Sequence, residues 1–313
     1  MSFYYAARDE GRLLSGSYNK FQVPYELIFD YRKNPTSDWG TYTYSGDFHF
    51  PPELEAWRAA LVGLFKNKGF LYKGDHICPR INNVFPGKDQ LSIEIQRATY
   101  FDQVATNLSL DYPLNDSLAK SLHARTVREW DLRQSGTIQG GIPPLSRSKL
   151  ANTIGVALGI TTTNAMGEKV ILIRRRTSHV AVSQNRLVLP FSFSLNLNEH
   201  ICNPGDSGSI SDLIKTDFRQ EQKEELGLDP EVLDFEKIKP VAFCRELCRG
   251  GKPQFFFRLE TDIKLGDLQG LVKESSTINK EFRGPLMGLT MDKAFKDMNR
   301  FSPELNAFIA TES

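Results

Sequence analysis

Residues 218–230 read Phe218-Arg-Gln-Glu-Gln-Lys-Glu-Glu-Leu-Gly-Leu-Asp-Pro230, a helix end rich in carboxylates. Glu221, Glu224 and Glu225 are spaced i, i+3 and i+4, so an α-helix places all three on one face. Like charges at this spacing repel by roughly 0.2–0.5 kcal/mol per pair in an isolated helix, and a bound cation reverses that cost. The spacing therefore indicates a divalent-metal site. The alternative is an acidic helix face that contacts only solvent.

The helix predicted here has defined ends. Ser209-Ile-Ser-Asp212 resembles a capping box, in which a hydroxyl accepts from a backbone N–H and an acid lies near the positive helix end. Ile214 and Phe218 give the helix an apolar side. Gly227 favours the left-handed conformation that closes a helix, and Asp229-Pro230 prevents continuation. The three glutamates thus lie in the last turns before a chain break.

The donor chemistry selects the metal. Magnesium prefers oxygen ligands and is commonly held by one or two carboxylates together with substrate phosphates. Manganese accepts the same oxygen donors. Zinc favours sulfur and imidazole, and neither stands close to the glutamates in the sequence. We therefore expect Mg²⁺, with Mn²⁺ as the alternative, at Glu221, Glu224 and Glu225.

The segment Gln220–Leu228 resembles the second half of the Nudix box. That motif is written Gly, five residues, Glu, seven residues, then Arg-Glu-U-x-Glu-Glu-x-Gly-U, where U is apolar. The matching positions are Glu221, Glu224, Glu225, Gly227 and Leu228. The departures are Gln220 for Arg, Gln222 for an apolar residue, Asp212 for the first Glu and Asp206 for the first Gly. The metal-ligand positions are retained while the supporting positions differ.

Three more stretches resemble the Nudix branch that hydrolyses UDP-glucose and UDP-galactose and carries an extra N-terminal domain. They are Thr99–Asn107, similar to Ser-Tyr-x-Asp-x-x-x-Thr-Asn; Asn152–Val156, similar to a Leu-Gly-Val strand; and Arg175–Ala181, similar to Arg-Arg-Ser-x-x-Val-Ala. The resemblance implies an α/β fold, a Nudix-type α/β/α sandwich with a mixed sheet, preceded by a smaller α+β domain. It also implies Mg²⁺-dependent cleavage of a nucleoside diphosphate-sugar, a UDP-sugar above all, to a nucleoside monophosphate and a sugar 1-phosphate.

The resemblance also names substrate-binding residues. Arg175 and Arg176 follow an apolar run, and their forked guanidinium groups suit a pyrophosphate. The alternative for them is solvated charge at a strand end. Tyr100, Asp102 and Asn107 are expected in a base or sugar pocket contributed by the first domain. The alternative for these three is a local turn with a packed tyrosine.

One departure bears on activity. After Leu187-Val-Leu-Pro190 the family pattern has Gly-Gly, whereas this chain has Phe191-Ser192. In the family that turn brings a backbone carbonyl close to the metal, and glycine permits an approach that a side chain obstructs. Residues 191–194 instead alternate as a strand does. The hypotheses are thus a hydrolase, a Nudix-like nucleotide-binding or sensor module that has lost turnover, or an interaction protein with a solvent-facing acidic helix.

Length and composition describe an ordinary globular chain. Its 313 residues suggest two domains, 1–148 and 149–313, divided after the Gly- and Pro-rich stretch Ser135–Pro144. The hydrophobic share is 40% and the charged share 25%. A net charge of +1 predicts no attraction to nucleic acid or membranes. No apolar run approaches a membrane span and no secretory signal is evident, so we expect a cytoplasmic protein.

Periodicity predicts the main elements. Pro51-Pro52 opens a helix with an apolar stripe of Leu54, Trp57, Leu61, Leu64 and Phe65, and residues 116–134 form a second helix. Strands are predicted at 153–162 and 169–174, joined by a hairpin turn, and at 238–247 and 254–261. Helices are predicted near 265–272 and 291–298. The four cysteines, Cys78, Cys202, Cys244 and Cys248, are expected to be free thiols.

Overall fold

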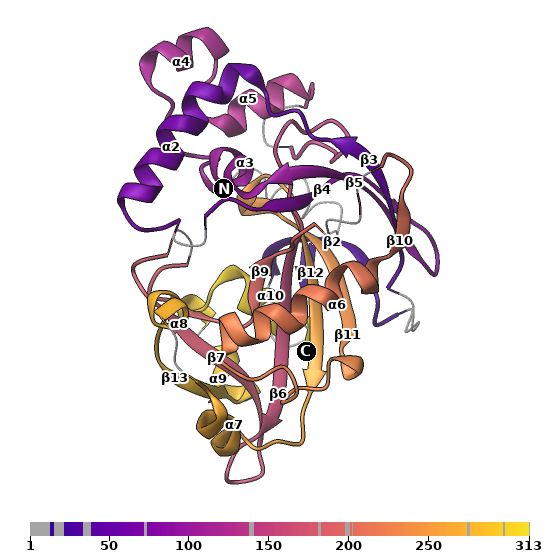
Figure 1. Ribbon diagram of the computed structural model, residues 1–313, viewed down its shortest axis with the longest axis vertical. Coiled ribbons are helices and arrows are strands. Elements are labelled where there is room, and N and C mark those ends of the chain that lie inside the picture. The colour runs from indigo at the N-terminus through magenta and orange to yellow at the C-terminus, as the bar shows by residue number, and fades with distance from the viewer. Residues whose placement is uncertain are drawn as a thin grey trace.

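The large sheet organises the chain. The computed structural model describes residues 13–15, 22–33, 39–71, 74–137, 141–180, 183–197, 201, 203–273, 276–296 and 298–312. Nine of the described strands form this sheet, seven of them in the order β1-β2-β11-β12-β6-β7-β13 (Figure 1). Their bounds are β1 Leu13–Ser15, β2 Gln22–Asp30, β11 Lys239–Glu246, β12 Lys252–Glu260, β6 Gly155–Thr163, β7 Lys169–Arg176 and β13 Phe282–Leu289. The other two, β8 (Leu187–Val188) and β9 (Ser192–Ser194), pair with β7 and β6.

The large sheet is mixed in direction and covered on both faces. β6 runs parallel to β12 and antiparallel to β7. Alternate residues along its strands belong to two different cores, as the two-residue period of a strand requires. One core receives helix α6 (Ile210–Glu221), which lies across the sheet in Figure 1, and the other receives α10 (Pro303–Glu312). The predicted α/β/α sandwich with a mixed sheet is confirmed.

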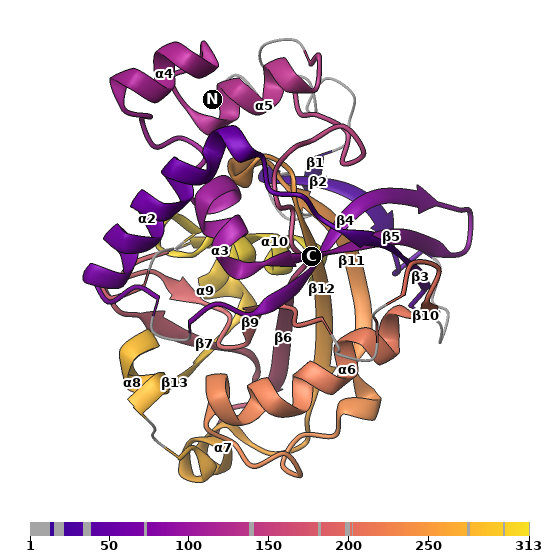
Figure 2. The same ribbon diagram turned by 45° about the horizontal axis from the view of Figure 1, so that its top comes forward.

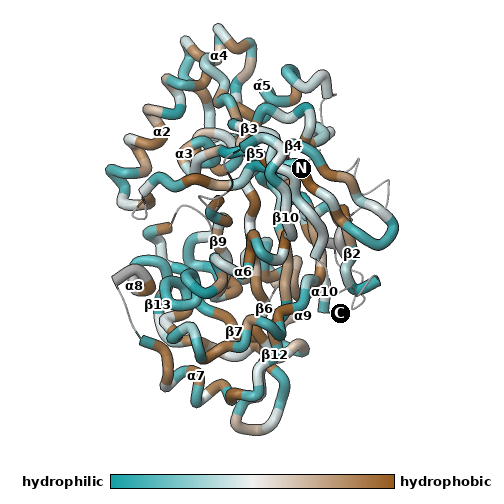
Figure 3. Tube along the Cα trace, turned by 45° about the vertical axis from the view of Figure 1, so that its right-hand side comes forward, coloured by the Kyte–Doolittle hydropathy of each residue, from teal (hydrophilic) through white to brown (hydrophobic). Residues whose placement is uncertain are grey.

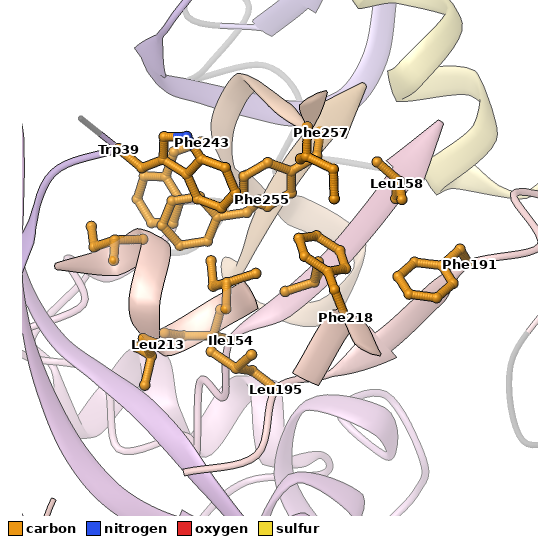
Figure 4. Packing of buried hydrophobic residues seen from close by; sticks show 14 of the residues in the cluster. Trp39, Ile154, Leu158, Phe191, Leu195, Leu213, Phe218, Phe243, Phe255 and Phe257 are labelled. Carbon is orange, nitrogen blue, oxygen red and sulfur yellow. The ribbon is translucent and has the colours of Figure 1, made fainter. Parts of the chain in front are cut away.

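The apolar composition of the strands explains this layering. Figure 3 shows apolar residues along β6, whose residues are buried from Gly155 to Thr162. On the α6 side, the core combines leucine and isoleucine side chains with aromatic rings, among them Phe191, Phe218 and Phe257 (Figure 4). Phe218 from α6 stacks on Phe191 with ring centroids 5.5 Å apart and meets Phe257 edge-on, also at 5.5 Å. The helix that carries Glu221 therefore packs on the sheet through Phe218 together with its buried Ile and Leu side chains.

A second, four-stranded sheet has the order β10-β3-β5-β4 (Figure 2). Its strands are β10 Ser207–Ser209, β3 Thr41–Asp47, β5 Leu91–Thr99 and β4 Ile77–Pro86. Strands cross the predicted boundary at 148 in both directions: β2 pairs with β11, and β10 pairs with β3. The division into domains 1–148 and 149–313 stays a prediction, and these pairings show that the two parts share their sheets.

The remaining helices lie mainly around the second sheet and at the C-terminus. They are α2 Glu55–Asn67, α3 Tyr100–Gln103, α4 Asp116–Leu122, α5 Val127–Gln134, α7 Leu265–Leu271, α8 Ser276–Glu281 and α9 Met291–Lys296. Short 3₁₀ or π turns are η1 Pro52–Leu54, η2 Val104–Leu108, η3 Gln222–Leu226, η4 Phe235–Lys237, η5 Leu247–Arg249 and η6 Met298–Arg300. Within the described ranges, no helix has the length and apolar character needed to cross a membrane.

Most predicted elements are confirmed, and three details differ. The helix predicted over 116–134 is two helices, because His123 takes a left-handed conformation and Thr126 caps a new start. Leu64, placed in the apolar stripe of α2, is exposed. The C-terminal region also contains β13 and α10, which the periodicity did not predict. Cys78, Cys244 and Cys248 are free thiols as predicted, and Cys202 lies outside the described residues.

Candidate functional site

A pocket of about 160 Å³ lies where the N-terminal helices meet the large sheet. This volume is comparable to the ~150 Å³ cavity that accommodates a benzene ring, so it has room for a reacting group and its neighbour. Four of the predicted site residues line it: Glu221, Glu225, Tyr100 and Arg176. Glu221 and Glu225 come from α6 and the turn η3 that follows it directly, whereas Tyr100 and Arg176 come from α3 and β7, which lie far from them in the sequence. The fold therefore brings together carboxylates, a phenol and a guanidinium that the sequence shows only apart.

The glutamates do not lie on one regular α-helical face. Helix α6 ends at Glu221, and residues 222–226 continue it as a π-helical turn. The wider turn shifts the positions that follow, so Glu221 and Glu225 reach the pocket and are buried. Glu224 is absent from the pocket lining, is partly exposed, and accepts from Gln220 Nε2 at 3.3 Å. The π turn thus separates Glu224 from the other two.

The end of this helix has the geometry expected from its sequence. Ser209 caps α6 by accepting from the backbone N–H of Ser211 at 3.0 Å. Gly227 closes η3 with a φ of +72°, and a Cβ there would lie 2.3 Å from the carbonyl oxygen of Lys273. Gln222, which replaces an apolar residue of the box, is fully buried and donates its amide to the carbonyl of Asp229. The loop after the helix thereby accepts the hydrogen bond of the Gln222 amide nitrogen, whereas Oε1 of the same side chain is buried without a hydrogen-bond partner among the described residues.

The three N-terminal candidates have different surroundings. Tyr100 lines the pocket, and its ring stacks on His76 with centroids 5.1 Å apart. Burial raises the pKa of Tyr100 to about 12, so its hydroxyl keeps its proton and can donate a hydrogen bond at neutral pH. Asp102 is not among the lining residues: it accepts from Arg58 at 2.6 Å and from the backbone N–H of Thr99 at 2.9 Å. Its contacts are those of a helix cap and an ion pair.

Asn107 is buried next to the pocket without lining it. Its Nδ2 donates to the carbonyl of Arg249 at 2.8 Å and to Asn152 Oδ1 at 3.0 Å. Its Oδ1 accepts from the backbone N–H of Asn152 at 2.9 Å. Asn152 has a φ of +39°, a strained conformation for a residue other than glycine. The Asn107 side chain therefore ties the N-terminal helical region to two segments of the large sheet.

The two predicted arginines separate at the end of β7. Arg176 lines the pocket and forms an ion pair with Glu281 at 3.1 Å, with both side chains nearly buried. Arg175 Nη1 donates to the carbonyl of Asn185 at 3.1 Å, outside the pocket lining. This divergence follows from the alternation of side chains along a strand. His179, which follows β7 three residues after Arg176, is exposed and is not among the lining residues.

A second group of charged residues in the pocket was not predicted. Arg249 at the end of η5 pairs with Glu246 at 3.2 Å and with Glu304 of α10 at 3.0 Å, and Lys252 opens β12 beside it. Burial raises the pKa of Glu246 to about 7. Burial also acts to raise the pKa of Glu304, but the charges of Arg249 and Arg176 and local hydrogen bonds together lower it. The only sequence signal is a pair of basic residues flanking Gly250-Gly251, which is also the pattern of an ordinary hairpin turn.

The Phe191-Ser192 departure has a structural explanation. Phe191 is fully buried, and its carbonyl accepts from the backbone N–H of Leu158 at 2.9 Å. Ser192 and Ser194 line the pocket, and Ser194 Oγ donates to Gln103 Oε1 at 3.2 Å. A core ring and a sheet hydrogen bond therefore occupy the place where the family pattern has two glycines.

The arrangement of the pocket carboxylates bears on whether they could hold a metal ion. Among the residues that the structure describes, no group of three or more His, Cys, Asp or Glu side chains is placed to hold a metal ion. The pocket nevertheless contains Glu221 and Glu225 from the predicted set. Two carboxylates fit the usual protein contribution to a magnesium site, in which waters and substrate phosphates complete the coordination.

Comparisons with known proteins give distant similarities only. No protein-family model matches the sequence, and no curated protein matches it. Similar solved structures include DR0079 from Deinococcus radiodurans, with 15% identity, 50% of this chain and 80% of that chain covered, and a TM-score of 0.33. Another is the C-terminal domain of mouse MUTYH, solved with human PCNA, with 12% identity, 51% and 86% covered, and a TM-score of 0.29. A third is RenU, a Nudix hydrolase from M. smegmatis, with 13% identity, 50% and 79% covered, and a TM-score of 0.28.

Proposed function

We propose that this chain is a Nudix-type hydrolase that cleaves the pyrophosphate bond of a nucleoside diphosphate-sugar. The products would be a nucleoside monophosphate and a sugar 1-phosphate, and the resemblance in the sequence favours a UDP-sugar. One observation carries the proposal: Glu221 and Glu225 of the box-like segment line a single pocket with Tyr100 and Arg176. A solvent-facing acidic helix would not bury two of its carboxylates in a pocket with cationic neighbours.

Glu221 and Glu225 would hold Mg²⁺, or Mn²⁺, together with phosphate oxygens of the substrate. The bound ion would supply neutralisation of charge at phosphorus and a more acidic water. Burial of both glutamates keeps solvent from competing for the same oxygens. These two residues, rather than the full set of three, are the metal ligands that we propose.

The other lining residues would bind and orient the substrate. The protonated Tyr100 hydroxyl can donate to a phosphate or sugar oxygen. Arg176 is positioned by Glu281, so its guanidinium would approach a phosphate in one preferred orientation. Preformed donors of this kind stabilise negative charge without reorganising during the reaction.

The second candidate is a nucleotide-binding module without turnover. It is favoured by Phe191, whose carbonyl is engaged in the sheet by Leu158. If the family's metal-facing carbonyl has no counterpart in this chain, a nucleotide would bind and remain intact.

The test is a panel of nucleotide-sugars incubated with the protein and Mg²⁺ or Mn²⁺, with release of monophosphate and sugar phosphate as the readout. We expect turnover that Glu225→Gln lowers at least 100-fold, and that Glu231→Gln, at an exposed position beyond the helix, leaves unchanged. Retention of activity in Glu224→Gln would distinguish two metal-binding glutamates from three. A melting shift without product would establish the binding module instead, and no response to metal or nucleotide would reject both.

A further inference from the structure

Lys252 is a buried cation directed at the pocket. Only 2% of its surface is exposed, and it lines the pocket at the first residue of β12. Within the described part of the chain, its Nζ has no hydrogen bond and no ion pair within 4.0 Å. Burying an ammonium without a direct partner is expensive. A protein that keeps such a group is expected to use it with a ligand.

The nearby carboxylates are already engaged by Arg249. Its guanidinium contacts Glu246 at 3.2 Å and Glu304 at 3.0 Å. Burial and the neighbouring Arg249 lower the pKa of Lys252 to about 8. Because burial also raises the pKa of Glu246 to about 7, part of its negative charge is lost near neutral pH. The group Glu246, Arg249, Lys252 and Glu304 then carries an excess of positive charge, which suits an anion.

Gly155 provides the space in which Lys252 lies. A Cβ added to Gly155 would come within 2.4 Å of Lys252 Nζ and 2.1 Å of the Gln254 side-chain amide. Contacts this short do not occur, so any larger residue at position 155 would displace both side chains. This space gives a reason for a glycine at the first residue of β6, where any side chain would collide with Lys252 and Gln254. The Lys252 side chain on β12 thus lies in space that is left by the missing side chain of Gly155 on β6.

The two arginines predicted to bind phosphate already have partners within the protein. Arg175 donates to the carbonyl of Asn185 away from the pocket, and Arg176 is paired with Glu281. Lys252 therefore differs from both: it is a pocket cation, and it has no carboxylate within ion-pair distance among the described residues.

We propose that Lys252, with Arg249 beside it, forms an anion-binding subsite that takes a phosphate group of the ligand. The proposal deepens the function proposed above by assigning the residues that bind a phosphate apart from Glu221 and Glu225. A phosphate oxygen would accept from the Lys252 ammonium and provide the partner that the protein itself does not. The same chemistry applies to inorganic phosphate, to pyrophosphate and to a nucleoside diphosphate, so the test must separate them.

The test measures binding without hydrolysis. Calorimetric titrations with inorganic phosphate, pyrophosphate and UDP are made on the full chain with EDTA present, which removes divalent metal. The wild type is expected to bind pyrophosphate or UDP, and Lys252→Gln to weaken that binding at least 10-fold. Lys239→Gln, which changes an exposed lysine on the neighbouring strand β11, is the matched control and should bind as the wild type does. Tighter binding of UDP than of pyrophosphate would identify a nucleotide as the ligand. Tighter binding of pyrophosphate would identify a free inorganic anion.

Gly155→Ala provides a second variant that keeps the lysine but displaces it. It should weaken anion binding as Lys252→Gln does. The ligand-free Lys252→Gln protein should melt at the wild-type temperature or above, because an unpaired buried charge has been removed. A lower melting temperature would mean that Lys252 has a structural partner.

The two proposals fail in different ways. Unchanged anion affinity in Lys252→Gln and Gly155→Ala, or absence of anion binding in the wild type, would overturn the subsite. Anion binding that depends on Lys252 in a protein that hydrolyses no nucleotide-sugar would keep the subsite and reject the hydrolase.

Discussion

Asn107 Nδ2 donates to the carbonyl oxygen of Arg249 at 2.8 Å, across 142 residues of sequence. The same amide side chain holds Asn152 through two further hydrogen bonds, to its side chain and its backbone. Arg249, which lines the pocket, in turn contacts Glu246 and Glu304. One buried amide therefore connects the N-terminal helical region to Arg249 of the pocket lining, although it does not line the pocket itself.

Asn107→Ala is expected to destabilise the protein by about 2–4 kcal/mol, because it leaves buried hydrogen-bonding groups of Asn152 and Arg249 without their partner. Urea unfolding followed by circular dichroism measures the change. Asn67→Ala, at an exposed position at the end of α2, should stay within about 0.5 kcal/mol of the wild type. Equal stability of Asn107→Ala and the wild type would contradict the role assigned to this amide.

Phe191→Gly, which introduces a glycine of the family pattern, is expected to cost about 3–5 kcal/mol. The reason is loss of a fully buried ring that stacks on Phe218 and lies against Phe235. Ser192→Ala removes only a hydroxyl and should change stability by less than about 1 kcal/mol. Thermal unfolding of both variants tests whether Phe191 is a core residue, and a mild effect at 191 would show that the ring is dispensable.

Gly159→Ala is expected to destabilise the contact between β6 and α10 by about 1–3 kcal/mol. An added Cβ would lie 1.9 Å from the ring of Phe308, which is fully buried and has little freedom to move. Gly63→Ala is the opposite case, since nothing lies within 4 Å of the new Cβ in helix α2. It should stabilise the protein by about 0.5–1 kcal/mol. Chemical denaturation would reject the packing argument if both variants changed stability in the same direction.

Asp217 is expected to make stability depend on pH. Burial raises its pKa to about 6, although the backbone N–H of Asn196 donates to it at 2.6 Å. Because the folded-state pKa lies above the unfolded value, the folded protein binds this proton more tightly. The resulting stabilisation is fully present below about pH 4 and is lost as the pH rises through about 6.

The size of this effect is on the order of 2–3 kcal/mol, and Asp217→Asn should remove that part of the pH dependence. An asparagine oxygen can still accept from Asn196, so the contact itself is retained. Unfolding free energies measured between pH 4 and pH 8 test this. Parallel curves for the variant and the wild type would exclude Asp217 as the titrating group.

The sequence predicts those parts of the site that depend on residues close together in the chain. The cap at Ser209, the break after Gly227 and the hairpin between β6 and β7 depend on residues a few positions apart, and each is present. The π turn at Gln222–Leu226 was not predictable in this way. The pattern of charges is compatible with a regular α-helix, and burial of Gln222 against the following loop accompanies the wider turn.

Local patterning in the chain thus determined the α/β class, most strands and helices, and the acidic segment with Glu221 and Glu225. The tertiary structure decided which polar residues share a pocket: it placed Glu221, Glu225, Tyr100 and Arg176 together with Lys252. It also directed Asp102, Asn107, Arg175 and Glu224 elsewhere. The physical reason is that period and capping act within a few residues, whereas burial depends on strands and helices brought together from distant parts of the chain.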